Sequence, residues 1–303
     1  MRVFVTGATG FIGSAVVPEL IGAGHEVIGL ARSDEGASAL KEAGAEVFRG
    51  SLDDPEGLAR AADGADGVIH LAFVHDFADF DAAGATDLRA IEAMGAALAG
   101  SDRPLVVTSG TAIAPAGRLA TETDAPAPGT HRTPSEEAAV ALAGQGVRGS
   151  VVRLAPSVHG RGDHGFVPHL IRIAREKGVA GYVGDGANRW PGVHRLDAAR
   201  LFRLVLEQAP AGTRWHAAAD EGVPFRDLAE VIGRHLDVPV VSVEPERAGE
   251  HFGFLGRFAG VDNPTSSAVT RERLGWRPEG PGLLADLDEG HYFESTSTVR
   301  SDR

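Results

Sequence analysis

Cysteine is absent from the 303 residues of this sequence. Its absence excludes disulfide bonds, thiolate nucleophiles, and zinc or iron–sulfur sites with cysteine ligands. Lysine and tyrosine are nearly absent, since the chain contains only Lys41, Lys177, Tyr182 and Tyr292. Any mechanism that requires a lysine or a tyrosine therefore has two candidate residues of each type.

Positive charge and long hydrophobic runs are also scarce. The chain has 29 lysines and arginines against 42 aspartates and glutamates, a net charge of −13 at pH 7. An acidic chain is a poor partner for nucleic acid or for an anionic membrane surface. No stretch approaches the roughly 18–20 apolar residues of a membrane helix, and the N-terminus has no signal-peptide pattern. We therefore expect a soluble, cytoplasmic protein with no nucleic-acid partner and no membrane partner.

The first 155 residues contain a regular alternation of short apolar runs and longer helical patterns. Some runs, such as Val3–Val5 and Leu105–Val107, are apolar at every position, which is typical of strands covered by helices on both faces. Repeated β–α units predict an α/β fold with a Rossmann-type doubly wound parallel sheet. Strands are expected at 2–6, 26–31, 45–49, 67–71, 104–109 and 149–154, and helices at 11–23, 34–43, 55–62, 81–99 and 134–144.

The pattern changes after Leu154. Glycine-rich loops and helical segments dominate, and a single further strand is expected at 238–243. We expect Asp197 to cap the helix that follows it. This pattern predicts a smaller, mostly helical C-terminal lobe. The predicted organisation is a core of 1–155 to which 193–220 returns, a lobe of 156–192 and 221–294, and a flexible tail of 295–303.

A glycine-rich loop joins the first expected strand to the first expected helix. The segment Thr6–Gly13 reads TGATGFIG, with G-x-x-G-x-x-G spacing. The first glycine permits the turn, the second lets the backbone approach a pyrophosphate, and the third lets the helix pack closely on the strand. The helix N-terminus presents free N–H groups to phosphates. This context predicts a dinucleotide site that includes Gly7, Thr9, Gly10, Phe11, Ile12 and Gly13.

The end of the second expected strand indicates which dinucleotide binds. An acidic residue there holds the 2′-hydroxyl of NAD, whereas an arginine accommodates the 2′-phosphate of NADP. The strand is followed by Arg32, and Asp34 and Glu35 come two and three residues later. We therefore predict NADP(H) as the cofactor, with NAD(H) as the alternative. In the competing interpretation, Arg32 is an ordinary surface residue.

Four further motifs accompany the glycine loop. They are Asp66–Ala72 (DGVIHLA), Val107–Ser109 (VTS), Val152–Pro156 (VRLAP) and Val193–Ala199 (VHRLDAA). With these motifs, the chain over about residues 1–220 resembles the short-chain dehydrogenase/reductase superfamily. The resemblance is strongest to the extended or atypical branch related to NAD-dependent epimerases and dehydratases.

The resemblance implies further cofactor contacts after other strands. In the loop after the third strand, the family's Asp-hydrophobic pair meets the adenine; here it reads Ser51-Leu52, which weakens or removes the polar contact. The acidic residues of Asp53–Pro55 are expected to cap the next helix instead. The remaining implied contacts are Leu71, Ala72 and Phe73 beside the ribose and nicotinamide, and Pro156 and Val158 at the nicotinamide carboxamide.

The Tyr-x-x-x-Lys motif, which supplies the proton donor in this superfamily, is missing. Neither tyrosine is followed four residues later by a lysine. Where the resemblance places the motif, Arg132 occupies the tyrosine position and Glu136 the lysine position. Arginine stays protonated and is a poor acid, but it can polarise a carbonyl or hold a carboxylate. The alternative is that Arg132 and Glu136 form an ion pair along the helix.

Hydroxyl and imidazole groups are the other catalytic candidates. Ser109 and Thr111 follow the fifth strand, where the superfamily keeps a hydroxyl that orients the substrate carbonyl; in the alternative, either residue only caps a turn. His75 and His159 follow the fourth and sixth strands, and an ordinary pKa near neutrality suits them to proton transfer. The histidines and acid of segment 159–169 fit no standard metal spacing, so no metal site is predicted.

These motifs predict an NADP(H)-dependent oxidoreductase of the atypical short-chain class that reduces a carbonyl of a small organic molecule. A sugar-nucleotide epimerase or dehydratase with bound NAD is the second hypothesis, and a catalytically silent dinucleotide-binding regulator is the third. The expected partner is a small carbonyl or alcohol substrate, bound at the C-terminal lobe. By resemblance, helices 81–99 and 134–144 would pair two subunits in a homodimer.

Overall fold

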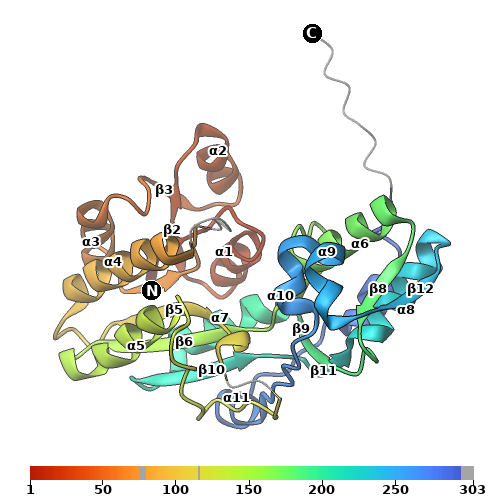
Figure 1. The fold of residues 1–303 in the computed structure, drawn as a ribbon. Coiled ribbons are helices and arrows are strands. Elements are labelled where there is room, and N and C mark those ends of the chain that lie inside the picture. The colour runs from red at the N-terminus through yellow and green to blue at the C-terminus, as the bar shows by residue number, and fades with distance from the viewer. Residues whose placement is uncertain (75–79, 115–116, 295–303) are drawn as a thin grey trace.

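The larger part of the protein is a seven-stranded parallel sheet (Figure 1). The computed structural model describes residues 1–74, 80–114 and 117–294. The strand order is β10-β6-β5-β4-β1-β2-β3, so the chain reverses direction across the sheet between β1 and β4. This is the order of a doubly wound fold, in which ligands bind beyond the carboxyl ends of the strands. The strands are β1 (Arg2–Thr6), β2 (Glu26–Ala31), β3 (Glu46–Arg49), β4 (Gly67–His70), β5 (Pro104–Gly110), β6 (Arg148–Leu154) and β10 (Thr213–Ala217).

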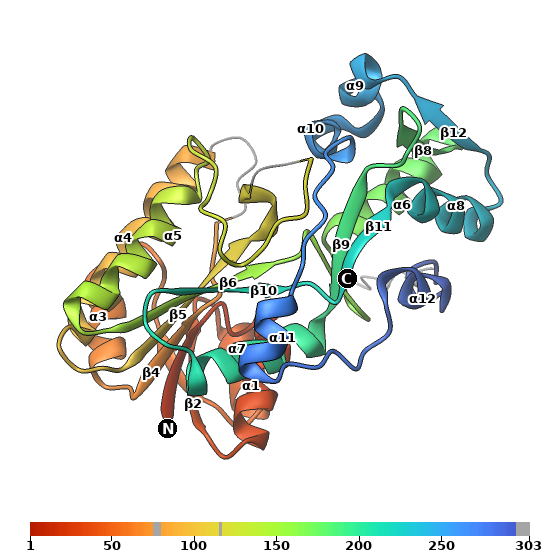
Figure 2. The ribbon, with the colours of Figure 1, turned by 90° about the horizontal axis from the view of Figure 1, so that it is seen from below.

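Helices cover both faces of this sheet (Figure 2). Helices α3, α4 and α5 pack on one face, where Leu58 and Ile91 are buried against the strands. Helices α1 and α7 pack on the other face, where Val16 and Phe202 are buried. The two apolar layers confirm the predicted Rossmann-type fold. The helices are α1 (Gly13–Gly22), α2 (Asp34–Glu42), α3 (Pro55–Asp63), α4 (Phe80–Leu98), α5 (Thr133–Ala141) and α7 (Arg195–Gln208).

A smaller lobe stands beside the sheet and has its own apolar core, which includes Trp190, Phe225 and Leu283 (Figure 1). The expectation of a single strand here is wrong, because the lobe contains a three-stranded and a two-stranded sheet. The lobe strands are β7 (Ser157–His159), β8 (Ala180–Val183), β9 (Arg189–His194), β11 (Asp220–Pro224) and β12 (Val240–Val243). The lobe helices are α6 (Phe166–Lys177), α8 (Phe225–Leu236), α9 (Ala248–Phe252), α10 (Gly256–Ala259) and α12 (Leu283–Asp288).

The first helix after the lobe strand β9 corrects one expectation about capping. Helix α7 begins at Arg195, and its N-cap position is His194, so Asp197 is not the cap. Asp197 is instead buried, and its two carboxylate oxygens accept hydrogen bonds from the N–H groups of Glu279 and Gly280, at 2.9 Å each. A carboxylate in the first turn of the helix thus fixes a segment 82 residues later in the chain.

The chain returns to the sheet near its C-terminal end. Helix α11 (Ala268–Leu274) and the fully buried Trp276 pack in the apolar layer of α1 and α7. The indole N–H of Trp276 donates to the carbonyl oxygen of Asp197 at 3.0 Å. Part of the segment that was expected in the lobe therefore completes the core of the sheet.

Hydropathy and length also constrain what the helices can do. Within the part of the chain that the structure describes, none of them combines the length and the apolar character needed to cross a bilayer. The tail predicted at 295–303 lies outside the described residues.

Candidate functional site

The glycine loop connects β1 to α1 in a conformation that depends on its glycines. Gly7 has a φ of +66°, and a Cβ there would lie 2.7 Å from the backbone nitrogen of Ala72, at the end of β4. A Cβ on Gly13 would lie 2.1 Å from the carbonyl oxygen of Gly7. Gly10 has more room, since its nearest neighbour would be the same oxygen at 3.3 Å. The first and third glycines thus serve backbone packing, and the second leaves the loop surface open.

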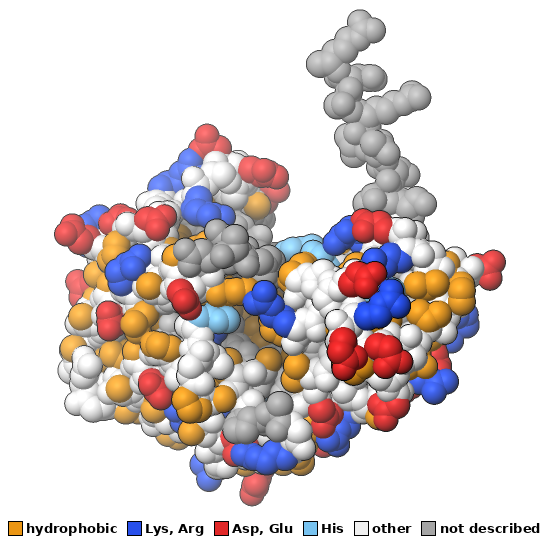
Figure 3. Space-filling model, in the orientation of Figure 1, with side chains coloured by type: hydrophobic (Ala, Val, Ile, Leu, Met, Phe, Trp, Pro, Cys, Tyr) orange, Lys and Arg blue, Asp and Glu red, His pale blue; other side chains and the backbone are white. Residues whose placement is uncertain are grey.

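A cleft of about 560 Å³ lies over this loop, at the carboxyl ends of the sheet strands. Figure 3 shows the surface hollowed between the two parts of the molecule, with hydrophobic and histidine side chains at the hollow. All fourteen residues predicted to contact the cofactor line this one cleft. They are Gly7, Thr9, Gly10, Phe11, Ile12, Gly13, Arg32, Ser51, Leu52, Leu71, Ala72, Phe73, Pro156 and Val158.

Seven further residues, which are not among the predicted cofactor contacts, line the same cleft. Asp53 and Asp54 were both expected to cap α3. Asp54 is the cap, since its carboxylate accepts a hydrogen bond from the N–H of Gly57 at 2.8 Å. Asp53 lines the cleft instead. For four of the others, 163–166, the sequence did contain a signal: a glycine-rich loop that follows β7. The additional residues are Leu30, Asp53, Val74, Asp163, His164, Gly165 and Phe166.

Arg32 is an exposed cation at the wall of the cleft. It makes no ion pair or hydrogen bond with any residue that the structure describes. The acid nearest to it in sequence, Asp34, forms an ion pair with Arg49, whose guanidinium also donates to the carbonyl oxygen of Ser33. The carboxylate that would compete for Arg32 is therefore occupied by another arginine, and Arg32 is available to a ligand.

A buried polar network ties the glycine loop to β4 and α4. The hydroxyl of Thr6 lies 2.7 Å from Nδ1 of His70 and accepts the N–H of Ala72 at 3.2 Å. Nε2 of His70 lies 3.1 Å from a carboxylate oxygen of Asp87. Burial alone would raise the pKa of Asp87, but its hydrogen bond with His70 and the charge of Arg132 outweigh burial and lower it. The network fixes the cleft-lining segment after β4.

Arg132 lies immediately before α5 and reaches toward the end of β5. One of its Nη groups donates to the carbonyl oxygen of Thr108, and its guanidinium stacks over the ring of Phe73, 4.1 Å from the ring centroid. Burial lowers the pKa of Arg132, while the nearby carboxylates of Asp87 and Glu136 oppose that shift. Because arginine ionises only at very high pH, Arg132 keeps its charge. It stands behind Phe73, which lines the cleft.

Glu136 does not pair with Arg132, so the expected ion pair along the helix is wrong. Glu136 is 1% exposed, and its carboxylate accepts hydrogen bonds from the guanidinium of Arg153 on β6. A further bond of 2.6 Å comes from Nε of Arg214 on β10. These bonds from Arg153 and Arg214 overcome the effect of burial and lower the pKa of Glu136. The acid at the family's lysine position is thus part of the core, and Arg132 is left without it.

The two hydroxyl candidates at the end of β5 differ in their surroundings. Ser109 is 5% exposed, and its Oγ has no hydrogen-bond partner among the described residues. Thr111 is fully buried, and its hydroxyl accepts a hydrogen bond from the side-chain amide of Asn263 at 3.1 Å. Ser109 therefore has an unused hydroxyl next in sequence to Thr108, whose carbonyl Arg132 binds, but neither Ser109 nor Arg132 is among the described residues that line the cleft. Thr111 anchors the segment before α11.

The two histidine candidates cannot be treated alike. His75 lies outside the described residues. His159 on β7 is fully buried and is not among the described residues that line the cleft. Its Nδ1 lies 2.9 Å from Asp286, and its ring stands edge-on to that of His194. A proton donor must reach the substrate, and His159 is enclosed by the lobe instead.

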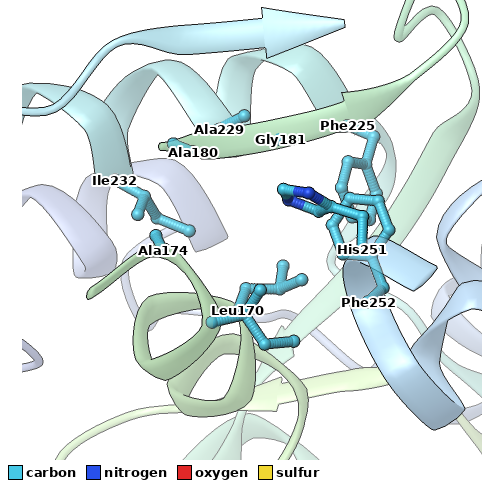
Figure 4. A pocket seen from close by; sticks show the side chains of 10 residues that line it. Leu170, Ala174, Ala180, Gly181, Phe225, Ala229, Ile232, His251 and Phe252 are labelled. Carbon is cyan, nitrogen blue, oxygen red and sulfur yellow. The ribbon is translucent and has the colours of Figure 1, made fainter. Parts of the chain in front are cut away.

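A second cavity lies inside the lobe, between α6, β8, α8 and α9 (Figure 4). Apolar side chains such as Leu170 and Phe252 enclose it together with the ring of His251. Its volume of about 10 Å³ is close to the minimum that holds one water molecule. The cavity is therefore too small for a substrate, and the large cleft is the candidate functional site.

Comparisons with known proteins agree with this geometry. The sequence model of the NAD dependent epimerase/dehydratase family matches residues 3–218. The chain is 52% identical to an uncharacterised protein of Schizosaccharomyces pombe, over 97% of this chain and all of that protein. It is 33% identical to the 2′-dehydrokanamycin reductase of Streptomyces kanamyceticus, over 82% of this chain and 71% of the reductase. The crystal structure of dTDP-glucose 4,6-dehydratase from Streptomyces venezuelae, with NAD bound, has a TM-score of 0.77 at 22% identity and covers 97% of this chain and 98% of that one.

Proposed function

This chain belongs to the NAD-dependent epimerase/dehydratase family, and on that basis we propose that it is an NADP(H)-dependent oxidoreductase that reduces the carbonyl group of a small organic molecule. The observation that carries the proposal is the cleft at the carboxyl edge of the sheet, where every residue predicted to contact the cofactor comes together. A relative that shares 33% of its residues is named a reductase, which supports reduction as the direction of the reaction.

The residues of the cleft fit a dinucleotide. Gly10 leaves the loop surface open to a pyrophosphate, and the first N–H groups of α1 lie beside it. Leu71, Ala72 and Phe73 continue the cleft from the loop to the position where Pro156 and Val158 supply an apolar wall. When bound, NADPH supplies the hydride that reduces the carbonyl carbon.

Arg32 supports NADP(H) over NAD(H). Its guanidinium is free of protein partners in the described chain, and the competing carboxylate of Asp34 is held by Arg49. A 2′-phosphate carries the charge and the acceptor oxygens that an arginine binds best. A 2′-hydroxyl would gain much less from the same side chain.

Arg132 and Ser109 are proposed to polarise the substrate carbonyl. The guanidinium has donors left after its bond to Thr108, and the Ser109 hydroxyl has no partner among the described residues. Ser109 lies near the end of β5, and Arg132, just before α5, is bonded to the preceding residue Thr108, so we propose that the two groups donate to one oxygen as negative charge develops on it. The fixed positive charge of Arg132 would stabilise that charge but would not deliver the proton, which water or His75 supplies.

The test is NADPH consumption with a panel of aldehydes and ketones. Losing one preorganised donor typically costs about 10²–10³ in kcat, so Arg132→Ala should lose turnover on that scale and keep its NADPH affinity. Arg132→Lys preserves the charge and should recover part of the loss. Arg247→Ala is the matched control, because Arg247 is exposed in the lobe and, of the residues that the structure describes, pairs only with Glu250.

The outcomes separate the competing functions. Full turnover in Arg132→Ala would show that the arginine has no catalytic role. NADPH binding without turnover on any carbonyl would support a silent regulator, and NAD retained through purification would support an epimerase or dehydratase. If His75 is the donor, His75→Ala abolishes the limb of the pH–rate profile near neutrality.

A further inference from the structure

The far C-terminal segment of the described chain packs against a loop that lines the cleft. Helix α12 contacts β7 and β9, and the residues that follow it reach the loop between β7 and α6. That loop, 160–165, begins at Gly160 with a φ of +135° and contains Gly162 with a φ of +88°. Its last residues, with Phe166, form one wall of the cleft. Residues more than 120 positions apart therefore meet beside the proposed cofactor site.

Tyr292 makes the central contact between the two segments. Its hydroxyl oxygen accepts the backbone N–H of Gly160 at 3.0 Å. The same hydroxyl donates to Oδ2 of Asp163 at 3.1 Å. Burial and the neighbouring Asp163 carboxylate raise the pKa of Tyr292, so its hydroxyl stays protonated and remains a donor at all working pH values.

The carboxylate of Asp163 is held by the protein on both oxygens. Oδ1 accepts the N–H of Gly165 at 2.6 Å, and Oδ2 accepts the hydroxyl of Tyr292. These two bonds satisfy both carboxylate oxygens and fix the turn that leads into α6.

The next loop residue links this turn to the glycine loop. His164 places its ring edge-on to the ring of Phe11, with 5.8 Å between the centroids. The guanidinium of Arg195 stands over the ring of Phe11, 5.2 Å from the ring centroid. The position of loop 160–165 thus determines what borders the glycine loop across the cleft.

The anchor of Tyr292 is itself well fixed. Asp286 on α12 is 3% exposed and is hydrogen-bonded to His159 and to His291, at 2.9 and 3.0 Å. His159 belongs to β7, directly before the loop. The segment that carries Tyr292 is therefore attached to β7, the strand that precedes the loop. This attachment fixes the position of the Tyr292 hydroxyl relative to the loop.

We propose that Tyr292 is a positioning residue that holds loop 160–165 in its cofactor-binding conformation through Gly160 and Asp163. The proposal rests on the dinucleotide-binding function proposed above. Tyr292 touches no cleft surface itself, and it acts through Asp163, His164 and Gly165. The chain has only two tyrosines, and this role assigns one of them to cofactor affinity rather than to proton transfer.

The experiment compares the full-length protein with Tyr292→Phe. The matched control is Tyr182→Phe, because Tyr182 lies on β8 beside Arg226 and does not line the cleft. Tyr292→Phe removes a hydrogen bond to a charged acceptor, and only part of the free energy of that bond affects the ligand. NADPH binding should therefore weaken roughly three- to tenfold. KM for NADPH should rise by the same factor while kcat stays unchanged. Amide exchange at Gly160 and Gly165 should accelerate in the cofactor-free protein, where the measurement is independent of any ligand.

A double-mutant cycle tests whether Tyr292 affects NADPH binding through Asp163. Asp163→Ala should weaken binding too, and combining it with Tyr292→Phe should add little, because both changes break the same contact. Asp163→Asn keeps an acceptor for Tyr292 and should recover most of the affinity. If the wild-type protein binds neither NADPH nor NADH, the proposed function fails. If the wild-type protein binds and Tyr292→Phe binds equally well with unchanged exchange at Gly160, the positioning role is wrong and the proposed function stands.

Discussion

Replacing Arg32 tests the cofactor assignment most directly. A charge-assisted hydrogen bond contributes about 1.5–3 kcal/mol, and each 1.4 kcal/mol changes an equilibrium constant about tenfold. Arg32 is exposed at the cleft wall, so solvent and salt screen its charge, with a Debye length of about 8 Å at physiological ionic strength. The lower end of the range applies, and Arg32→Ala should weaken NADPH binding about tenfold. NADH has no 2′-phosphate, so its affinity should change little.

The assay is a fluorescence titration of NADPH and NADH at two salt concentrations. The loss for NADPH should be larger at low salt, because screening is then weaker. Arg32→Asp should go further and reverse the preference, since an acid there repels the phosphate and can hold a ribose hydroxyl. Arg89→Ala is the control: Arg89 is exposed on α4 and, within the described chain, donates only to Thr86 of its own helix. Equal losses for both dinucleotides, or no loss at all, would refute a phosphate-binding role for Arg32.

Three further predictions concern stability and can be checked by urea or thermal denaturation. Gly13→Ala should cost roughly 1–3 kcal/mol or more, because the new Cβ would collide with the Gly7 carbonyl, whereas Gly22→Ala in the same helix meets nothing within 4 Å and should be neutral or stabilising. Glu136→Ala should cost about 3–5 kcal/mol, because it leaves the buried Arg153 without its counter-ion; the exposed neighbour Glu137→Ala should cost almost nothing. The hydrogen bond from Arg118 lowers the pKa of Asp124 to about 2. Since this lies below the unfolded value of about 3.9, the ionised carboxylate stabilises the fold above that pH, and the stabilisation disappears as pH falls toward 2. Asp124→Asn should therefore lose about 1 kcal/mol at pH 7, and the difference from the wild type should shrink as pH falls through about 2; a constant difference across that range would contradict this reasoning.

The cleft at the carboxyl edge of the sheet could be predicted because its determinants are local in sequence. The loop after β1, the end of β2 and the segment after β4 each follow a strand whose apolar residues are easily recognised. Parallel strands bring their carboxyl ends to one edge, so local motifs are enough to place these residues together. The same logic placed the first six sheet strands within one residue of their observed bounds.

The strand β10 shows why other parts could not be predicted. Its sequence, TRWHA, has an arginine and a histidine at positions that reach partners far away in the chain. Arg214 bonds to Glu136, and the buried His216 lies 2.9 Å from the carbonyl oxygen of Ser266. The hydropathy pattern of the strand contains no sign of these partners. The glycine-rich sequence of 160–165 marks a loop after β7, but it does not indicate the contacts with Tyr292 that accompany its conformation, so its residues were not predicted as a wall of the cleft.

The insertion of Trp276 into the sheet core has a consequence for synthesis on the ribosome. All seven strands of the sheet have been translated once Ala217 is made, yet one buried indole of its apolar layer is still about 60 residues away. At roughly 5–20 residues per second, the nascent sheet waits about 3–12 s for that side chain. During this interval the backbone of Asp197 lacks its indole donor, and the apolar layer formed with α1 and α7 lacks the Trp276 side chain. A chaperone that binds nascent chains would find its exposed apolar surface there, and release of the chain would coincide with closure of the core.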